Sequence, residues 1–477
     1  MSSPSAARRQ DRHAFAFDGP SGIALVAVLA VALFTIGFLV WPVLNPGPGT
    51  SDTAPPTASV SPTVQPSVTL APSPTSEPTP TAAPTSTPVA RWTGLSWSDP
   101  VTPSFFVHLD DLLPWGDGYV AVGRLPVGAG LTQAGFLTSP DGLNWTVTYQ
   151  FDPVGDRYPQ HLVASGDTLF AFSPRALDDV EIVLPSGSYS GPLVWSSTDG
   201  AAWTLVDSPS WEEGWREARQ HVGALPAGWV TTQYDIETGF VDAARGPAGI
   251  IAIGNSFADD GLGLAPILLH SFDGLTWSRS ILPNDSPSAI LNSIAAVDGG
   301  YVVVGAVDVG SDPRTAVPAA WYSADGLTWT RATVEDDPDF VASGEFGPLA
   351  AGTDGLVTCF NSRSMGAGGW RYMDPWTSTD GLTWTAARVG DLEHPRYACG
   401  WMASDGVRIV ALSGRTSPTG LPWPGVTGAW VSADGASWMP MTVSEVMTDM
   451  LERYWVVPDG VIYAGEQAFW FGTAIER

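Results

Sequence analysis

The sequence predicts an all-β fold, a seven-bladed β-propeller of four-stranded antiparallel blades that is closed by pairing of its N- and C-terminal strands. Two observations lead to this prediction. A seven-residue unit, Ser-x-Asp-Gly-x-x-Trp, occurs six times, and successive aspartates are 52 to 74 residues apart, the length of a four-stranded sheet with its loops. Seven short turns, most of them rich in Asp and Gly, also separate apolar segments, which is a strong local signal for β-hairpins.

Each copy of the unit has a structural logic. Its Gly can take a positive φ at low steric cost, its Asp can accept hydrogen bonds from the turn's own N–H groups, and its Trp can bury a large area between neighbouring sheets. We therefore interpret these residues as structural. They are Asp141 and Trp145, Asp199 and Trp203, Asp273 and Trp277, Asp325 and Trp329, Asp380 and Trp384, and Asp434 and Trp438.

The segment 290–333 shows the four strands expected in each blade. An apolar stretch precedes the turn Asp298-Gly299-Gly300, and an alternating strand starts at Tyr301. A polar loop, a third apolar strand at 319–322, the Asp-Gly turn and a fourth strand at 327–330 complete the repeat.

The turns between first and second strands outnumber the Ser-x-Asp-Gly-x-x-Trp units by one. These seven turns lie at 116–118, 165–167, 246–249, 298–300, 353–355, 404–406 and 458–460. The last repeat has no fourth strand after 468–471, whereas residues 94–98 at the other end of the domain match the fourth strand of the units. We expect 94–98 to complete the last blade, because closure removes exposed sheet edges.

Residues 91–477 resemble the Asp-box, or BNR-repeat, propellers of the sialidase-like superfamily through this repeated unit. The family's box reads Ser-x-Asp-x-Gly-x-Thr-Trp, so the turn here is one residue shorter. In sialidases, three arginines hold the sialic acid carboxylate beside a Tyr nucleophile, its Glu partner and an Asp acid. The resemblance implies that an enzyme of this kind would be a glycoside hydrolase.

The N-terminal residues predict a membrane protein. Residues 1–20 are a short, Arg-containing tail, and 21–42 hold an apolar run from Ile23 to Trp41, long enough for a transmembrane helix. A cleavable signal peptide is the alternative, but its apolar region would be shorter and followed by a small-residue cleavage site. The basic flank predicts a single-pass cell-membrane protein with a cytoplasmic N-terminus and an extracytoplasmic C-terminal domain.

Residues 43–90 form a Pro/Thr/Ser-rich linker. Only Asp52 and Glu77 are charged, and no apolar core can form, so we expect a disordered extracellular segment with polyproline II character. It either holds the following domain away from the membrane or serves as a tether without preferred length.

Charge and composition exclude several functions. The formal net charge is −28, which should repel a polyanion, so we expect no nucleic-acid partner. No lysine occurs, which rules out Schiff-base and P-loop chemistry. The two cysteines, Cys359 and Cys399, lie in consecutive repeats of the external part and form either a disulfide or two buried thiols.

The predicted topology separates two faces. The turns between first and second strands share one end of the blades with the Ser-x-Asp-Gly turns; we term this end the turn face. The long, dissimilar loops share the opposite end, the loop face, where variable loops on a rigid scaffold usually bind ligands. In the longest loop, 206–242, Ser210-Trp211-Glu212-Glu213 predicts a capped helix that Trp211 and Trp215 pack against the domain.

Four arginines follow the second strands on the loop face and are candidate ligand-binding residues: Arg124, Arg175, Arg363 and Arg415. Guanidinium groups can hold a carboxylate or sulfate bidentately, although pairing with nearby acids is the simpler interpretation. Gly123-Arg124-Leu125-Pro126 is similar to an arginine motif of sialidases, with Gly in place of the aromatic residue. Tyr454, Tyr463 and Glu466 match the family's nucleophile pair only by residue type.

Acidic residues also cluster in loops, at 178–181, 259–260 and 335–339, without the ordered spacing of a calcium site. We interpret them as solvated charge and expect no metal and no cofactor.

Together these features predict a monomeric, membrane-anchored, extracytoplasmic propeller that binds a ligand, protein or glycan on its loop face without catalysis. Whether it is an enzyme stays open at this stage. One alternative is a sialidase-like exo-glycosidase acting on an anionic sugar. A transmembrane signalling protein such as an anti-sigma factor is a third interpretation, which the short cytoplasmic tail disfavours.

Overall fold

The computed structural model describes most of the C-terminal part of the chain. The described residues are 92–103, 108–128, 131–151, 158–173, 182–184, 187–189, 191–220, 239–257, 264–283, 289–307, 316–335, 344–362, 373–387, 402–416, 422–443, 451–465 and 468–476. Residues 1–42, the predicted tail and transmembrane segment, and the linker 43–90 lie outside this part. No helix within the described ranges has the length and apolar character needed to cross a bilayer.

The described residues fold almost entirely into antiparallel β-sheets. Four of the sheets have four strands each and follow one another along the chain. They consist of β2 (His108–Trp115), β3 (Gly118–Gly128), β4 (Leu131–Ser139) and β5 (Thr146–Gln150); of β6 (His161–Ser165), β7 (Thr168–Phe172), β10 (Val194–Ser197) and β11 (Thr204–Leu205); of β12 (Gly239–Gly246), β13 (Gly249–Phe257), β14 (Leu264–Ser271) and β15 (Ser278–Ser280); and of β16 (Ile290–Val297), β17 (Gly300–Val307), β18 (Val317–Ser323) and β19 (Thr330–Arg331).

The remaining sheets use the same antiparallel unit and add strands at its outer edge. A five-stranded sheet contains β21 (Gly344–Ala351), β22 (Leu356–Ser362), β23 (Met373–Ser378) and β24 (Thr383–Ala386), with β20 (Thr333–Val334) parallel to β24. An eight-stranded sheet contains β25 (Met402–Ser404), β26 (Ile409–Thr416), β27 (Pro422–Ser432), β28 (Met439–Val443), β1 (Trp92–Trp97), β31 (Phe469–Glu476), β30 (Gly460–Gly465) and β29 (Leu451–Val457), in that spatial order. A separate hairpin joins β8 (Ile182–Leu184) to β9 (Gly187–Tyr189).

The two ends of the described chain meet in the eight-stranded sheet. β1 pairs antiparallel with β31 over the whole of Trp92–Trp97, so it begins two residues before the segment that the sequence indicates. Its Gly94 and Leu95 also pair with β28 in parallel, which joins two successive four-stranded groups. This pairing covers both long edges that the terminal strands would otherwise expose.

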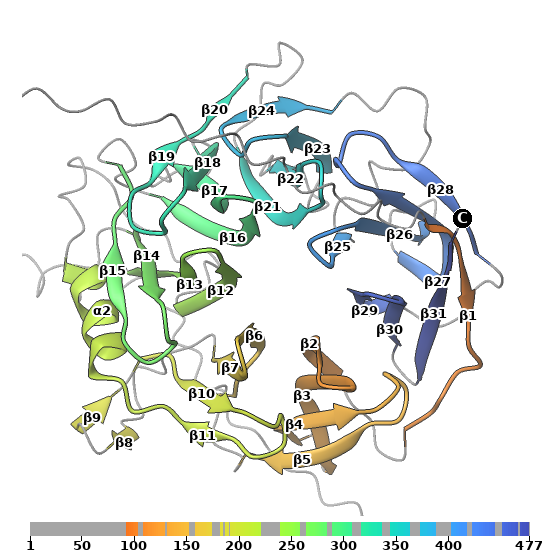
Figure 1. The fold of residues 1–477 in the computed structure, drawn as a ribbon, viewed down its shortest axis with the longest axis horizontal. Helices are drawn as coiled ribbons and strands as arrows, with labels where there is room; N and C mark the ends of the chain where they lie inside the picture. The colour runs from red at the N-terminus through yellow and green to blue at the C-terminus, as the bar shows by residue number, and fades with distance from the viewer. Residues whose placement is uncertain are drawn as a thin grey trace, which may run out of the picture. The chain divides into compact units, whose positions relative to one another are not determined.

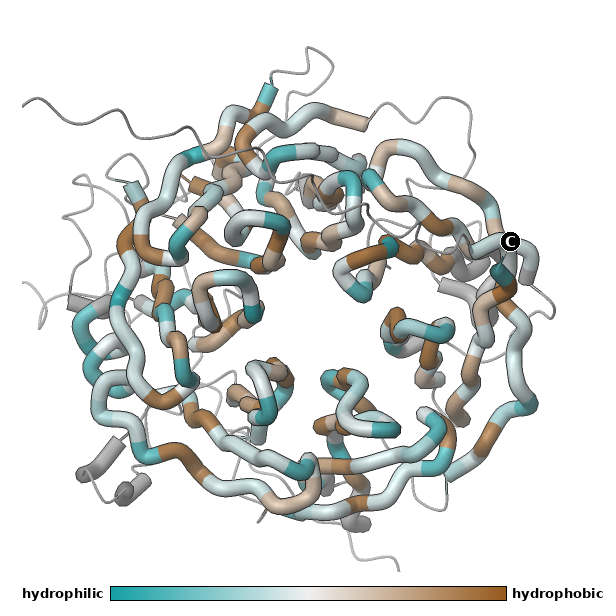
Figure 2. The backbone as a smooth tube through the Cα atoms, viewed as in Figure 1, coloured by the Kyte–Doolittle hydropathy of each residue, from teal (hydrophilic) through white to brown (hydrophobic). Residues whose placement is uncertain are grey.

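The first strand of each four-stranded group lies innermost in a propeller-like arrangement (Figure 1). We call these the inner strands; they are β2, β6, β12, β16, β21, β25 and β29. Each contacts the next one in this order, and β29 contacts β2, so the series returns to its start. In Figure 2 hydrophobic stretches follow the strands, and the tips of many inner hairpins are hydrophilic.

Every Ser-x-Asp-Gly turn is held by its own side chains. In the first copy the Ser139 hydroxyl donates to Asp141 Oδ1 at 3.0 Å and accepts from the Gly142 N–H at 2.9 Å. Asp141 Oδ1 also accepts from the N–H groups of Leu143 and Asn144. The same serine and amide contacts recur in the other five copies, so these aspartates are engaged by their own turns.

The glycine of each turn is pressed onto the second strand of the preceding sheet. All six glycines have φ of 72° or 73°, and a Cβ would meet a buried side chain of that strand; at Gly274 it would overlap the ring of Phe170. The tryptophans extend the same contact, since Trp203 stacks on Phe136 at 3.8 Å between ring centroids. The repeated unit therefore closes a hairpin and packs two sheets together at once.

The one helix of the described residues, α2 (Pro209–Gln220), covers the outside of the β12–β15 sheet. It begins earlier than the sequence indicates, because Ser208 rather than Ser210 accepts from the Trp211 N–H. Ser210 instead accepts from the Trp277 N–H at 2.9 Å. Trp211 and Trp215 are buried against the domain, so they anchor the helix.

Replacing Gly274 with alanine should destabilise the fold more than the same change at Gly166. Both glycines have positive φ, but a Cβ at Gly166 meets no atom within 4 Å. Backbone strain of about 1 kcal/mol applies to both variants, and overpacking against Phe170 adds about 1–3 kcal/mol at Gly274 alone. Urea unfolding followed by tryptophan fluorescence measures both; equal losses would show that the turn is not wedged between sheets.

Candidate functional site

Five of the seven inner strands have a β-bulge in their pairing with the second strand. In β2 the pairing with β3 shifts between Leu109 and Asp111, and in β12 the pairing with β13 shifts between Phe240 and Asp242. Similar shifts occur in β16, β21 and β29. A bulge redirects side chains, and in β2 and β12 it directs a carboxylate toward the neighbouring inner strand.

Asp111 and Asp242 connect inner strands in the same way. Asp111 Oδ2 accepts from the Leu162 N–H of β6 at 2.8 Å, and Asp242 Oδ2 accepts from the Ile294 N–H of β16 at 3.1 Å. In each case Oδ1 accepts from the N–H of the following residue. Trp455 of β29 donates its indole N–H to Asp111 at 3.2 Å, so Asp111 joins three inner strands.

Burial raises the pKa of both carboxyl groups to about 6. Hydrogen bonds from Leu162 and Leu112 and the charge of Arg453 lower the pKa of Asp111 but do not outweigh burial. At Asp242 the hydrogen bonds from Ile294, Ser293 and Ala243 likewise lower the pKa without outweighing burial. The negative charge of Asp111 raises the pKa of Asp242 further. Both residues keep some exposed surface, but their carboxylates are enclosed by these contacts.

Arg124 lies at the same loop-face end, beside β2. Its Nη2 lies 2.9 Å from His108 Nδ1 and donates to Asp110 Oδ1 at 3.3 Å. The Asp110 side chain is 6% exposed, whereas Arg124 remains 36% exposed and His108 27% exposed. Arg453 donates from Nη1 to the backbone carbonyl of Asp110. We call Arg124, His108, Asp110, Asp111 and Arg453 the loop-face cluster.

The other three candidate arginines cannot be placed against Arg124. Arg175 and Arg363 lie outside the described residues. Arg415 pairs through its backbone with Trp423 at the loop-face end of β26, and the direction of its side chain is not described.

The candidate tyrosines are part of the core. Tyr454 is 7% exposed, and its hydroxyl donates to the Val410 carbonyl at 2.8 Å and accepts from the Leu412 N–H at 3.3 Å. Burial raises the pKa of Tyr454 well above its usual range. Tyr463 is fully buried, and Glu466 lies outside the described residues.

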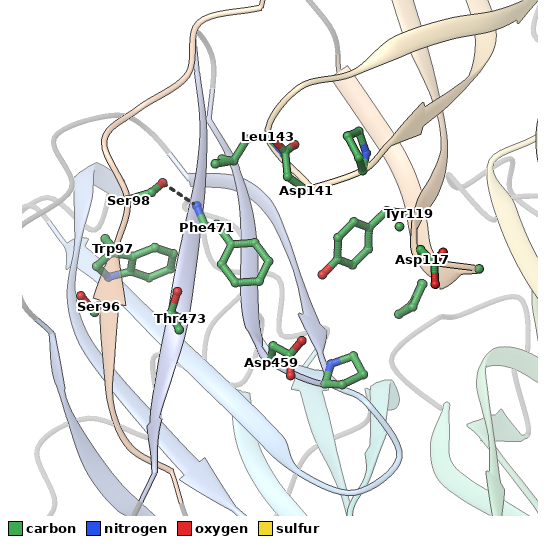
Figure 3. Close-up of a pocket in the computed structure, with 15 residues that line it drawn as sticks. Ser96, Trp97, Ser98, Asp117, Tyr119, Asp141, Leu143, Asp459, Phe471 and Thr473 are labelled. Atoms are coloured by element: carbon green, nitrogen blue, oxygen red, sulfur yellow. Dashed lines mark hydrogen bonds between the residues drawn. The ribbon is translucent and has the colours of Figure 1, made fainter.

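A pocket of about 710 Å³ opens on the turn face between the β2–β5 sheet and the β29–β31 strands (Figure 3). Its wall includes the aromatic residues Trp97, Tyr119 and Phe471 together with Asp117 and Asp459. It is lined further by Ser96, Ser98, Pro114, Gly116, Gly118, Pro140, Asp141, Leu143, Pro458 and Thr473. Sequence reasoning missed this site because its residues come from five separate stretches, within 96–98, 114–119, 140–143, 458–459 and 471–473.

Several other predicted features fall partly or wholly outside the described residues. Cys359 is buried in β22, whereas Cys399 is not described. The acidic loops 178–181 and 259–260 are not described, and of 335–339 only Glu335 is. Within the described ranges no group of three or more His, Cys, Asp or Glu side chains could hold a metal ion.

Comparisons with known proteins identify no family. No family model matches the chain, and no curated protein does. Similar solved structures include the phage phi92 endosialidase (12% identity, 81% of this chain and 70% of that chain, TM-score 0.40) and the GH74 xyloglucanase from Xanthomonas campestris (15%, 75% and 50%, TM-score 0.39). The β-propeller domain of the Trilobed protease from Pyrococcus furiosus aligns at 9% identity over 77% of this chain and 95% of that domain, with TM-score 0.41. This chain spans about half the length of the xyloglucanase. The fold of this chain is assigned from the strand pairing described above.

The free energy of unfolding should fall as pH rises from about 4 to 7. A carboxyl group whose pKa is raised from 3.8 to about 6 by folding favours the folded state while protonated, so this stability is lost as pH rises through 6. We expect a loss on the order of 2 kcal/mol for each of Asp111 and Asp242. Urea unfolding at pH 3 to 8 measures this slope, which the D111N/D242N variant should flatten.

Asp273→Asn is the matched control for this pH series. Partial burial acts to raise the pKa of Asp273, but its hydrogen bonds from Thr276, Leu275 and Ser271 outweigh this effect and lower it. Its contribution is therefore lost only as pH falls through that lowered value. The Asp273→Asn control should change the free energy of unfolding at acidic pH but keep its slope between pH 4 and 7. An unchanged slope in D111N/D242N would show that Asp111 and Asp242 do not cause the pH dependence.

Proposed function

We propose that the chain is a single-pass membrane protein whose residues 91–477 form an extracytoplasmic, seven-bladed Asp-box propeller that binds a protein or glycan partner on its loop face without catalysis. In this proposal residues 21–42 anchor a monomer, 1–20 are cytoplasmic, and 43–90 are the linker. The blade number is supported by the circular contacts of the inner strands and by the pairing of β1 with β31. The Asp-box assignment is supported by the repeated hydrogen bonds of the Ser-x-Asp-Gly turns.

The loop-face cluster is the observation that carries the binding proposal. Its members are held in fixed positions by contacts between inner strands, yet His108 and Arg124 keep about a third of their side-chain surface exposed. A rigid scaffold that presents polar groups at one end suits recognition of a partner, because little ordering is needed on binding. On the turn face, by contrast, the box carboxylates are engaged by their own turns.

The same cluster favours binding over the sialidase-like alternative. The charge of Arg124 is already offset by Asp110 at 3.3 Å, whereas a sialidase arginine is directed at the carboxylate of the sugar. The hydroxyl of Tyr454 is committed to the backbone of β26, so it does not serve as a nucleophile. An exo-glycosidase acting on an anionic sugar would therefore need a nucleophile other than Tyr454.

We also propose that Cys359 and Cys399 form a disulfide. The burial of Cys359 and the predicted extracytoplasmic setting support this pairing, since disulfides persist in oxidising compartments.

A photo-crosslinking residue in place of His108 should capture the partner in intact cells. The same residue in place of Phe272, which is 72% exposed on the turn face, should not. Adding Arg124→Gln should reduce the yield at position 108 at least tenfold, because it removes the exposed guanidinium but keeps an amide donor for Asp110. Gel shift and mass spectrometry measure the adducts.

Equal capture from both faces contradicts loop-face binding. Release of free sialic acid from a sialoside by the wild-type protein, and its loss in the Arg124→Gln variant, would favour the glycosidase.

Protease added to intact cells should release the propeller as a soluble fragment. The linker is exposed on the outer side in this topology, and an unstructured Pro/Thr/Ser-rich segment is cleaved more readily than packed β-sheets. Immunoblotting against the C-terminus measures the fragment, and lysed cells give the total. Protection in intact cells together with cleavage after lysis would contradict the extracytoplasmic orientation.

A further inference from the structure

We propose that the turn-face pocket binds an organic cation, an ammonium or guanidinium group on a short apolar stem. This site is separate from the loop-face cluster, since the pocket is formed at the opposite ends of the strands. It does not depend on the function proposed above.

The pocket lies beside the place where the first and last strands of the described residues pair. In the other four-stranded groups a turn joins the third and fourth strands, and six of these turns carry the Ser-x-Asp-Gly sequence. β31 and β1 occupy these positions in the last group and are contributed by opposite ends of the chain, so no such turn connects them. Trp97, Phe471 and Thr473 therefore line an open space, and the Ser139–Trp145 turn of the next sheet forms the facing wall with Pro140 and Leu143.

The charge of the pocket is negative. Asp117, Asp141 and Asp459 line it, and no Lys, Arg or His is among its lining residues. The carboxylate of Asp141 is engaged by the N–H groups of its turn and by Asn144. The side chains of Asp117 and Asp459 are exposed, and no described residue forms a hydrogen bond or ion pair with either carboxylate, so both carboxylates are available to a ligand. A negatively charged ligand would be repelled.

Aromatic rings provide the second half of the recognition. Figure 3 shows the rings of Tyr119 and Phe471 facing each other across the pocket, with Asp459 below them and Trp97 on the far side of Phe471 from Tyr119. Asp141 and Asp459 lie on the pocket wall around Tyr119 (Figure 3), and burial, followed by the charges of Asp459 and Asp141, raises the pKa of the Tyr119 hydroxyl. A cation between aromatic faces gains from both the ring quadrupole and the carboxylates.

The combination selects an organic cation rather than a metal ion. A hard metal ion needs several oxygen ligands around one point, and no such group of acidic side chains occurs in the described part of the chain. The volume of about 710 Å³ lies within the range of small-ligand sites, and it far exceeds what a bare ion needs. An alkylammonium, an alkylguanidinium or the side chain of an arginine or lysine fits this chemistry.

The direct test compares n-butylguanidinium with its neutral isostere n-butylurea, using the full chain in lipid nanodiscs. Binding is followed by calorimetry and by tryptophan fluorescence, because Trp97 lines the pocket. We expect n-butylguanidinium to bind at least tenfold more tightly than n-butylurea and to weaken as salt is raised. No binding of n-butylguanidinium at 10 mM would overturn the proposal. Equal affinities for the two compounds would also overturn it and would indicate a neutral ligand such as a sugar ring.

Variants locate the binding. Asp117→Asn with Asp459→Asn should weaken n-butylguanidinium at least tenfold, and Phe471→Leu should weaken it severalfold. Asp167→Asn with Asp298→Asn is the matched control, because it removes the same two charges at exposed aspartates of the corresponding turns, between β6 and β7 and between β16 and β17. An equal loss in the control would mean that only the net charge of −28 attracts the cation, which would overturn the site. Unfolding curves for each variant separate loss of binding from loss of fold.

A second ligand tests whether the natural cation is a side chain of a basic polypeptide or a free small molecule. An acetylated and amidated Ala-Arg-Ala peptide should bind at least tenfold more tightly than n-butylguanidinium if the natural ligand is a basic polypeptide. Equal or weaker binding of the peptide indicates a free small amine or guanidine; both outcomes support the cation site. Arg124→Gln should leave all these affinities unchanged, so failure of this proposal and failure of loop-face binding are distinguishable.

Discussion

The pairing of β1 with β31 is the contact on which the rest of the described fold depends. It joins residues as far apart as Thr93 and Ile475, whose hydroxyl and carbonyl groups are hydrogen-bonded at 3.1 Å. Each sheet is buried on both faces only if it has a neighbour on both sides. One core cluster combines Leu109, Leu137 and Trp145 with Ile462 and Phe469, so it forms only when the last strands lie beside the first sheet. Without closure, the apolar faces of two sheets and two strand edges would be exposed to water.

The two faces use carboxylates for different purposes. On the turn face a box aspartate such as Asp141 accepts hydrogen bonds from its own turn, so its charge stabilises local structure. Near the loop face Asp111 and Asp242 cross from one inner strand to the next, at the cost of raised pKa values. The hydrogen bonds of the turn face thus recur in all six Ser-x-Asp-Gly turns, whereas the carboxylate contact between inner strands is made by Asp111 and Asp242.

Closure by two chain ends also leaves a local irregularity. In the last repeat the fourth strand is β1, which precedes the other strands in the chain, so no Ser-x-Asp-Gly turn links it to β31. The aromatic residues beside this junction line the pocket. The acidic residues around it come from ordinary hairpin turns at 117 and 459. At this junction acidic side chains lie beside partly buried aromatic rings, and this combination is what favours a cationic ligand in our proposal.

The sequence by itself determined the all-β character, the four-strand repeat and the positions of the tight turns. These features follow from local rules, since alternating apolar residues form strands and Asp-Gly forms turns whatever lies around them. The sequence also indicated the terminal strand near 94–98, because a missing strand and a spare one could be counted. Only the tertiary structure decided that Ser208 caps α2, since Ser210 is taken by Trp277 from another segment. It likewise brought Arg124 to Asp110, Asp111 to Leu162, and Tyr119 to Phe471 in one pocket, because such contacts depend on bulges and on sheet packing that no local pattern encodes.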